Sequence, residues 1–451
     1  MSSIQIDMND TDGGWARELL RAVRAGMRRI GTWWMAGALL AALVPPLHAA
    51  QEKPKAEDKP AAGEKPKDPA TKVTASQDGF LIQSEDGAFR LRIAGYTHAD
   101  GRFYAGDEDE LGTSAFLLRR VRPIVSGTFA RIFDFTIMPD FGGGVAVLQD
   151  GFIEARYSEK ARLRIGKFKA PFGLERLQSA TVILFVERAL PSSLAPIRDV
   201  GAQLHGELGR GVAAYAVGVF DGALDGGSVD TDTNDGKDVA GRVFLQPFKT
   251  SKAKAAQGIG IGIAATTGKQ EGALPALRSP GQLTFFSYAT GVVAGGTRTR
   301  LSPQASYANG PFRLIGEYVR SSQDVRKGTE TSRVTNDGWQ ATAAFLLTGE
   351  TPAAGVVSPK APFEKGKGWG AFELAARYSE LDVDDAVFAR GLADPDRSAS
   401  KARAIGVGLN WYLTKNFKSV VDYERTTFEG GRTGGDRETE NALLFRAQVS
   451  F

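Results

Sequence analysis

The chain contains no cysteine in 451 residues, and histidine is scarce, with three in all. Without cysteine, a scaffold held by disulfides and a metal site built on thiolates are both excluded. Only His98 and His205 lie beyond the first 50 residues, and neither accompanies a serine pattern typical of hydrolases. We therefore predict a protein that is not an enzyme and holds no cofactor.

Long apolar runs are also missing. Beyond the N-terminus no run of 18 apolar residues occurs, which excludes a membrane protein built from helices. A transmembrane β-barrel is still compatible with the composition, because its strands place every second residue on the water-filled side. The formal net charge is only +4, so any preference for anions must come from where the arginines lie.

Residues 1–50 have the order of a secretory signal. Arg28 and Arg29 precede an apolar stretch at 33–44, and small residues follow before position 51. A basic region, a short apolar region and a small-residue cleavage site compose such a signal. We expect residues 1–50 to direct export, with Met27 as an alternative start.

Residues 51–78 consist largely of lysine, proline, glutamate and alanine. Such a segment has almost nothing to bury, so we predict a solvated periplasmic tether. Its acidic residues offset its lysines, which argues against binding to nucleic acid.

From residue 79 to residue 451 the hydrophobic pattern has a period of two, and we predict one all-β domain. In the stretch 403–413, Ile405, Val407 and Leu409 share one face. A soluble sandwich shows the same alternation, but its strands usually have about 5–6 residues, whereas a membrane barrel needs about 9–11. Several segments here reach the longer value, which favours a transmembrane antiparallel barrel.

The connections between the predicted strands alternate in length. Short turns such as 130–131 and 309–310 alternate with long polar stretches such as 222–237 and 382–400. This alternation is typical of outer-membrane barrels, and it gives about 16 strands. The stretches 274–293 and 347–368 cannot be assigned clearly.

The C-terminus gives a more specific signal. Leu443, Phe445, Val449 and the terminal Phe451 share one face of a predicted last strand. This ending resembles the C-terminal signal of bacterial outer-membrane barrels. The alternative is an ordinary edge strand that happens to end in an aromatic residue.

The longest connection, residues 174–199, is the most informative segment. It exceeds the roughly 12–15 residues beyond which an unstructured connection is usually functional or disordered. Leu184, Phe185 and Leu190 need burial, so disorder is not expected. We predict a loop folded into the barrel mouth, which buries its apolar residues on the inner wall and presents its arginines to passing solutes.

Five runs of the sequence are distinctive. They are LRRVRP at 118–123, GKFKAPFG at 166–173, GTRTRLSP at 296–303, GEYVRS at 316–321 and ELAARY at 373–378. Together these runs resemble the phosphate-selective porins O and P. The resemblance spans roughly residues 80–451. It implies a 16-stranded trimeric outer-membrane porin whose third long loop folds inward, with basic residues that guide phosphate-like anions.

We predict that this anion pathway is formed by basic residues of the lumen and the loop. They are Arg90, Arg92, Arg120, Arg122, Lys167, Lys169, Arg176, Arg188, Arg198, Arg298, Arg300 and Arg377. Lys167 and Lys169 share a face with apolar neighbours, so a bulge at Gly166 is needed to turn them inward; otherwise they lie at the rim or at a subunit contact. Lumen arginines can also pair with lumen acids and simply fill the wall.

The expected function is passive diffusion of small anions, phosphate or related oxyanions, through a homotrimer surrounded by outer-membrane lipid and lipopolysaccharide. Two alternatives remain. The first is a general or sugar-permeable porin, in which solute size matters more than charge. The second is a barrel with a closed pore that serves as an envelope anchor or adhesin.

Overall fold

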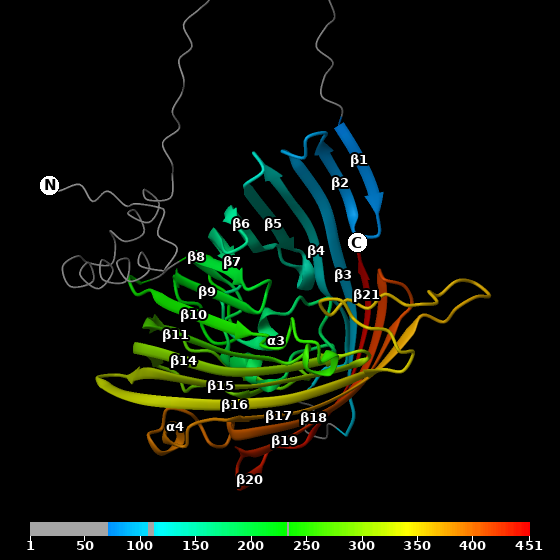
Figure 1. The fold of residues 1–451 in the computed structure, drawn as a ribbon. Coiled ribbons are helices and arrows are strands. Elements are labelled where there is room, and N and C mark those ends of the chain that lie inside the picture. Colours follow the sequence, from blue (N-terminus) through cyan, green and yellow to red (C-terminus); the bar gives the residue numbers. More distant parts are fainter. Residues whose placement is uncertain (1–70, 107–111, 232–233) are drawn as a thin grey trace, which may run out of the picture. The chain divides into compact units, whose positions relative to one another are not determined.

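The alternating pattern folds into a closed antiparallel barrel. The computed structural model describes residues 71–106, 112–231 and 234–451, and the sheet closes where β21 pairs with β3 (Figure 1). Sixteen strands form the wall, which confirms the predicted fold class and strand number. They are β3 (Arg90–Tyr104), β4 (Ala115–Phe129), β5 (Phe133–Asp140), β6 (Val147–Ser158), β7 (Ala161–Phe168), β8 (Asp199–Leu208), β9 (Ala213–Phe220), β10 (Asp238–Leu245), β11 (Gly260–Gly272), β14 (Val292–Asn309), β15 (Phe312–Lys327), β16 (Glu330–Leu346), β17 (Ala371–Asp382), β18 (Ala399–Tyr412), β19 (Phe417–Arg432) and β21 (Glu440–Ser450).

The remaining elements are short. They are β1 (Thr71–Ser76), β2 (Gly79–Ser84), β12 (Leu277–Arg278), β13 (Thr284–Phe286), β20 (Gly435–Asp436), α3 (Leu174–Leu177), α4 (Ala386–Ala389) and the 3₁₀ turns η1 (Gly142–Gly144), η2 (Leu190–Leu194) and η3 (Lys254–Ala256). In the part of the chain that the structure describes, no helix has both the length and the apolar character needed to cross a membrane.

The two faces of the wall differ in polarity. On β18, Ile405, Val407 and Leu409 are exposed, whereas the alternate residues Ala404 and Asn410 are completely buried. In a soluble protein the apolar side chains of a sheet are the buried ones. Here the apolar face points outward and the polar face inward, as expected for a barrel wall in lipid.

The two ends of the barrel have different connections. We call one end the turn rim; it has the short connections 130–132, 159–160, 209–212, 310–311 and 413–416 and also the C-terminus. The other end, the loop rim, has the long connections 169–198, 221–237, 273–291 and 383–398. Two connections of the turn rim, 246–259 and 347–370, are long, and the second contains a stretch that could not be assigned from its pattern.

A hairpin of β1 and β2 continues the wall at the turn rim. β21 pairs with Tyr96–Tyr104 of β3, and β2 pairs with the same edge of β3 over Arg90–Ile93. Lys415 Nζ lies 2.8 Å from Asp78 Oδ1 and ties the hairpin to the turn after β18. The predicted tether therefore ends before β1, because the β-branched residues Thr71, Val73 and Thr74 favour a strand. The rest of that tether and the predicted signal at 1–50 lie outside the described residues.

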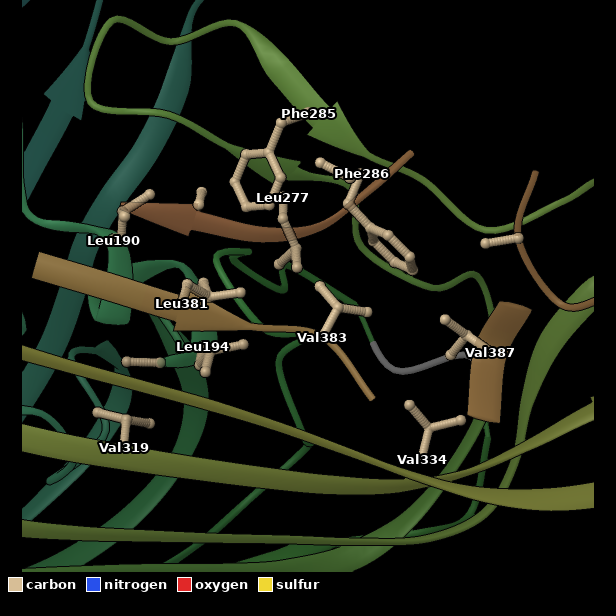
Figure 2. Close-up of a cluster of buried hydrophobic side chains, with 14 of the residues drawn as sticks. Leu190, Leu194, Leu277, Phe285, Phe286, Val319, Val334, Leu381, Val383 and Val387 are labelled. Atoms are coloured by element: carbon tan, nitrogen blue, oxygen red, sulfur yellow. The ribbon is translucent and has the colours of Figure 1, made fainter. Parts of the chain in front are cut away.

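An apolar core lies near the loop rim, where three long connections pack together (Figure 2). Connection 169–198 contributes Leu190 and Leu194, and connection 273–291 contributes Phe285 and Phe286. Figure 2 shows Phe286 beside Val383 and Val387, and Leu194 between the strand residues Leu381 and Val319. The connections thus bury apolar surface against one another and against the wall, which holds them in place.

Candidate functional site

Polar groups of the inner face hold connection 169–198. The backbone N–H groups of Leu174 and Glu175 donate to the Glu317 carboxylate of β15 at 2.6 and 3.3 Å. Farther along the segment, the backbone N–H of Val186 donates to Asp422 of β19. The segment therefore covers two carboxylates of the wall with its own backbone donors.

Side chains of three more wall positions donate to backbone carbonyls of the same segment. They are Lys418 to Ile183 O at 2.8 Å, Asn410 to Leu184 O at 2.9 Å and Gln448 to Thr181 O at 3.2 Å. The contacts come from β18, β19 and β21. Residues 181–186 consequently lie against the inner face of these strands.

Glu175 joins the two ends of the segment. Its carboxylate accepts hydrogen bonds from Ala189 N at 3.0 Å, Ser192 Oγ at 3.0 Å and Gln340 Nε2 at 3.1 Å. Arg377 Nη1 lies 3.7 Å from the same carboxylate. These donors satisfy the hydrogen-bonding capacity of a carboxylate that is buried inside the segment.

Glu187 lies among three arginines of β3 and β4. Arg119 Nε is 2.6 Å from its carboxylate, Arg102 Nη2 is 3.3 Å away and Arg120 Nη2 is 3.9 Å away. Burial alone would raise the pKa of Glu187, but the charges of Arg119 and Arg120 outweigh it and hold the pKa well below its usual value. Glu187 is therefore ionised at neutral pH, and one negative charge faces three positive ones.

Two cavities lie on this side of the segment. The larger has a volume of about 880 Å³, and the smaller about 370 Å³. Asp150, Lys169 and Leu177 line both, so the two cavities are neighbours on either side of these residues. The larger cavity carries three carboxylates, on Asp140, Asp150 and Glu187, against nine basic side chains, on Arg102, Arg119, Arg120, Arg122, Lys169, Arg176, Arg188, Arg198 and Arg278.

Three of these basic groups hydrogen-bond to uncharged carbonyls. Lys169 Nζ donates to Gln178 O at 2.7 Å, Arg188 Nη2 donates to the same oxygen at 2.9 Å, and Arg176 donates to Ser192 O. Burial, together with the charges of Arg188 and Arg198, lowers the pKa of Lys169 well below its usual value. An anion in the cavity would stabilise the positive form of all three side chains.

The structure brings together six of the predicted pathway residues in the larger cavity: Arg120, Arg122, Lys169, Arg176, Arg188 and Arg198. Two of them have a carboxylate partner at short distance. Arg122 Nε lies 2.7 Å from Asp140, and Arg198 Nε lies 3.0 Å from Asp150.

The other predicted residues lie elsewhere. Arg298 and Arg300 are buried in the wall, 2.9 Å from Asp238 and 2.6 Å from Asp225 respectively. Arg377 pairs with Glu424, and Arg90 and Arg92 lie exposed at the start of β3, beside the hairpin of the turn rim. These positions match the alternative in which arginines pair with acids or lie at a rim.

Lys167 and Lys169 differ from each other. The pairing of β6 with β7 runs through Gly166 without a register shift, although Gly166 has a φ of 130°. Lys167 remains in the strand and pairs with Asp230 of connection 221–237. Lys169 reaches the cavities because it lies beyond the end of β7, so no bulge is required.

Sequence patterns missed several basic residues of the cavities. In the larger cavity these are Arg102, Arg119 and Arg278, and in the smaller one Arg162, Arg164 and Arg242. Arg102 could have been found, since it shares the alternating face of His98 and Asp100. Arg119 could not have been found from alternation. A register shift between β3 and β4 leaves Arg119 unpaired with β3, whereas its neighbour Arg120 pairs with His98.

Comparisons with known proteins agree with this architecture. The family model for phosphate-selective porins O and P matches residues 91–451. Porin O of Pseudomonas aeruginosa is 24% identical over 429 residues, covering 86% of this chain and 95% of that protein. Among solved structures, the outer membrane channel DcaP of Acinetobacter baumannii has a TM-score of 0.54 at 10% identity, covering 82% of this chain and 99% of its own. OmpT of Vibrio cholerae has a TM-score of 0.52 at 9% identity, covering 82% of this chain and all of its own.

The family match runs from the first strand of the barrel wall to the last residue, the same part that forms the closed barrel. The protein is accordingly a porin of the bacterial outer membrane and not an enzyme. In such barrels the short turns face the periplasm, so the turn rim is the periplasmic end. This chain belongs to the phosphate-selective porin O and P family.

Proposed function

We propose that this porin conducts small inorganic anions, phosphate or related oxyanions, by passive diffusion. The observation that carries the proposal is the excess of nine basic side chains over three carboxylates around the larger cavity. Fixed positive charge along a pore admits anions, and the planar guanidinium group fits the oxygens of phosphate. The family description also names phosphate.

Residues 174–199 form the constriction in this proposal. Their backbone donors cover Glu317 and Asp422, which removes two negative charges from the surface of the lumen. On the other side, Arg176 and Arg188 of the same segment line the larger cavity. The segment therefore narrows the lumen and makes the remaining passage more positive.

The path of the anion runs from the larger to the smaller cavity beside Lys169, which lines both. Arg176 and Arg188 contribute positive charge that no short ion pair cancels among the described residues, and an anion beside Lys169 would stabilise the positive form of that side chain. Each of these side chains already donates a hydrogen bond to a backbone carbonyl. An anion must compete with that hydrogen bond, so its binding stays weak enough for release.

Planar-bilayer recordings test the proposal. The wild-type channel is expected to have an anion-selective reversal potential, and millimolar phosphate should reduce its chloride current. In the Arg176→Gln/Arg188→Gln variant, the anion-to-cation permeability ratio and the reduction of chloride current by phosphate should each fall by at least about threefold. The reason is that the variant removes two positive charges from the path. The matched control is Arg131→Gln/Arg397→Gln, which removes two exposed arginines far from the cavities.

A cation-selective wild-type channel would contradict the proposal. A chloride current that phosphate leaves unchanged would restrict the function to general anions and remove the phosphate preference. A channel with no measurable conductance would support the anchor or adhesin alternative. The larger cavity gives the sugar-porin alternative little support, because Tyr96 is the only aromatic residue among the described residues that line it, whereas Phe152, Phe168 and Tyr215 line the smaller cavity.

We also propose that the porin is a homotrimer whose outer face contacts membrane lipid and lipopolysaccharide. OmpT of Vibrio cholerae, which shares the fold at a TM-score of 0.50, has been solved in a trimer form. Residues 1–50 as an export signal and the stretch before β1 as a tether complete the proposed organisation.

A further inference from the structure

The long periplasmic connection 347–370 passes from the inner to the outer face of the barrel. Near its start, Val357 packs against the buried residues Leu346, Ala371 and Tyr412. Near its end, the Phe363 ring lies 5.8 Å from the ring of Trp411. Figure 1 shows this connection, in yellow to orange between β16 and β17, projecting from the barrel.

Four aromatic rings form a cluster at the outer end of this connection. Phe372 stacks on Trp411 at 5.7 Å, and Phe363 lies edge-on to Trp369 at 6.5 Å. Trp411 Nε1 donates to Trp369 O at 2.6 Å, which fixes the connection against β18. Trp369 nevertheless keeps 71% of its surface exposed.

This cluster continues the apolar outer face of the wall. Leu374 follows Phe372 on the outward side of β17, and Leu409 precedes Trp411 on the outward side of β18; both are exposed. Tryptophan and other aromatic residues gather where a barrel wall meets lipid head groups. The cluster therefore lies at the level of the periplasmic lipid head groups.

Two lysines lie in the same connection, between Phe363 and Trp369. Glu364 and Lys367 exchange two backbone hydrogen bonds of 2.9 Å and form a tight turn. Lys365 and Lys367 are exposed, and neither has an ion-pair partner among the residues that the structure describes. Glu364 is the single acidic residue between positions 359 and 370, so the turn has net positive charge.

We propose that Phe363, Lys365, Lys367, Trp369 and Trp411 form a binding site for an anionic phospholipid of the periplasmic leaflet. The rings contact the glycerol and upper acyl region, and the two ammonium groups pair with the phosphate and with the negative head group. A neutral zwitterionic lipid offers the same apolar contacts, but its own positive group opposes the lysines. The site therefore distinguishes lipids by net charge.

Fluorescence quenching in vesicles tests this site. The full-length porin is placed in phosphatidylcholine vesicles that contain increasing fractions of brominated phosphatidylglycerol or brominated phosphatidylcholine. The Trp369 signal is the difference between the protein and its Trp369→Phe variant. We expect half-maximal quenching at a phosphatidylglycerol fraction at least about fivefold lower than the phosphatidylcholine fraction, with the difference decreasing at high salt.

The Lys365→Gln/Lys367→Gln variant should lose this preference while its quenching by phosphatidylcholine stays unchanged. The matched control is Lys252→Gln/Lys254→Gln on connection 246–259 of the same rim, where both lysines are exposed. An equal response to both lipids in the wild type, or a preference retained in the Lys365→Gln/Lys367→Gln variant, would overturn the proposal. Absence of quenching by either lipid would show that protein, such as a neighbouring copy, covers Trp369, and would also overturn it.

Discussion

Arg446 and Asp100 show how the wall uses most of its internal charge. Both side chains are buried, and two hydrogen bonds of 2.8 and 2.6 Å join them across β21 and β3. Such a pair contributes to the seam of the barrel rather than to the solute path. Arg298 and Arg300 of β14 are also paired inside the barrel, with Asp238 and Asp225 respectively.

We expect the Arg446→Met substitution to destabilise the barrel by about 3–5 kcal/mol, because it leaves the buried Asp100 carboxylate without its partner. Urea unfolding in lipid vesicles, followed by tryptophan fluorescence, measures the change. The control is Arg131→Met, which breaks the exposed pair with Asp86 and should cost less than about 1 kcal/mol. Equal losses in the two variants would show that burial does not determine the contribution of these pairs.

Glu187 has the opposite role, since it lowers the positive charge of the larger cavity. We expect Glu187→Gln to raise the anion-to-cation permeability ratio by at least about twofold. Since the pKa of Glu187 lies well below its usual value, the wild type keeps this negative charge throughout pH 5–8, and the two proteins should differ equally at both ends of that range.

Reversal potentials in asymmetric salt measure this ratio, with Glu330→Gln as the control. Glu330 is an exposed carboxylate at the tip of the β15–β16 hairpin, away from the cavities. A difference that disappears at pH 5 would mean that Glu187 is already protonated there, which the surrounding arginines should prevent.

At the residue scale, alternation along the strands predicted correctly that the polar face is inward. It could not separate solute-facing arginines from wall arginines, because the partners lie far away in sequence. Arg300, for example, pairs with Asp225 of connection 221–237. The loop arginines Arg176, Arg188 and Arg198 belong to an apolar segment too long to be a simple turn, and they line the larger cavity; their part in the anion path stays a prediction.

At the scale of single elements, connection 169–198 is held both by polar contacts with the wall and by buried apolar clusters. Glu317 and Asp422 accept three of its backbone N–H groups, while Leu190 and Leu194 anchor it among the other long connections. The polar contacts orient the segment, and the apolar ones supply most of the burial.

We expect the Glu317→Ala/Asp422→Ala variant to loosen this segment. Its single-channel conductance should rise and become noisier, because the backbone donors of the segment lose their acceptors while its apolar anchors remain. Single-channel recordings measure both quantities. The control Glu429→Ala removes an exposed carboxylate near the loop rim and should leave them unchanged. A conductance equal to that of the wild type would argue against the segment as the constriction.

Two elements could not be predicted from the pattern of their residues. Connection 347–370 turns from the inner to the outer face, so its apolar residues follow neither a strand nor a helix period. Strand β1 was hidden in a polar, lysine-rich stretch, since its side chains are all exposed and only its pairing with β2 makes it a strand.

At the scale of the whole molecule, closure of the barrel was predictable because it needs only strand number and alternation. The trimer could not be predicted from the pattern, since exposed apolar side chains occur on strands all around the barrel and do not single out a subunit contact. We expect the unheated protein to migrate in detergent gels at about three times the mass of the heated chain, as porin trimers resist the detergent. Migration at the monomer position before heating, supported by light scattering in mild detergent, would contradict a trimer.

The place where β21 ends has a practical consequence. Phe451 exchanges backbone hydrogen bonds with Gly95, and the next stretch of that same edge, Arg90 to Ile93, is already occupied by β2. A residue appended after Phe451 would meet Gly79 and Phe80 head-on. Affinity tags or fluorescent fusions at the carboxyl end must therefore push the N-terminal hairpin aside, whereas insertions between β19 and β21 leave the junction intact.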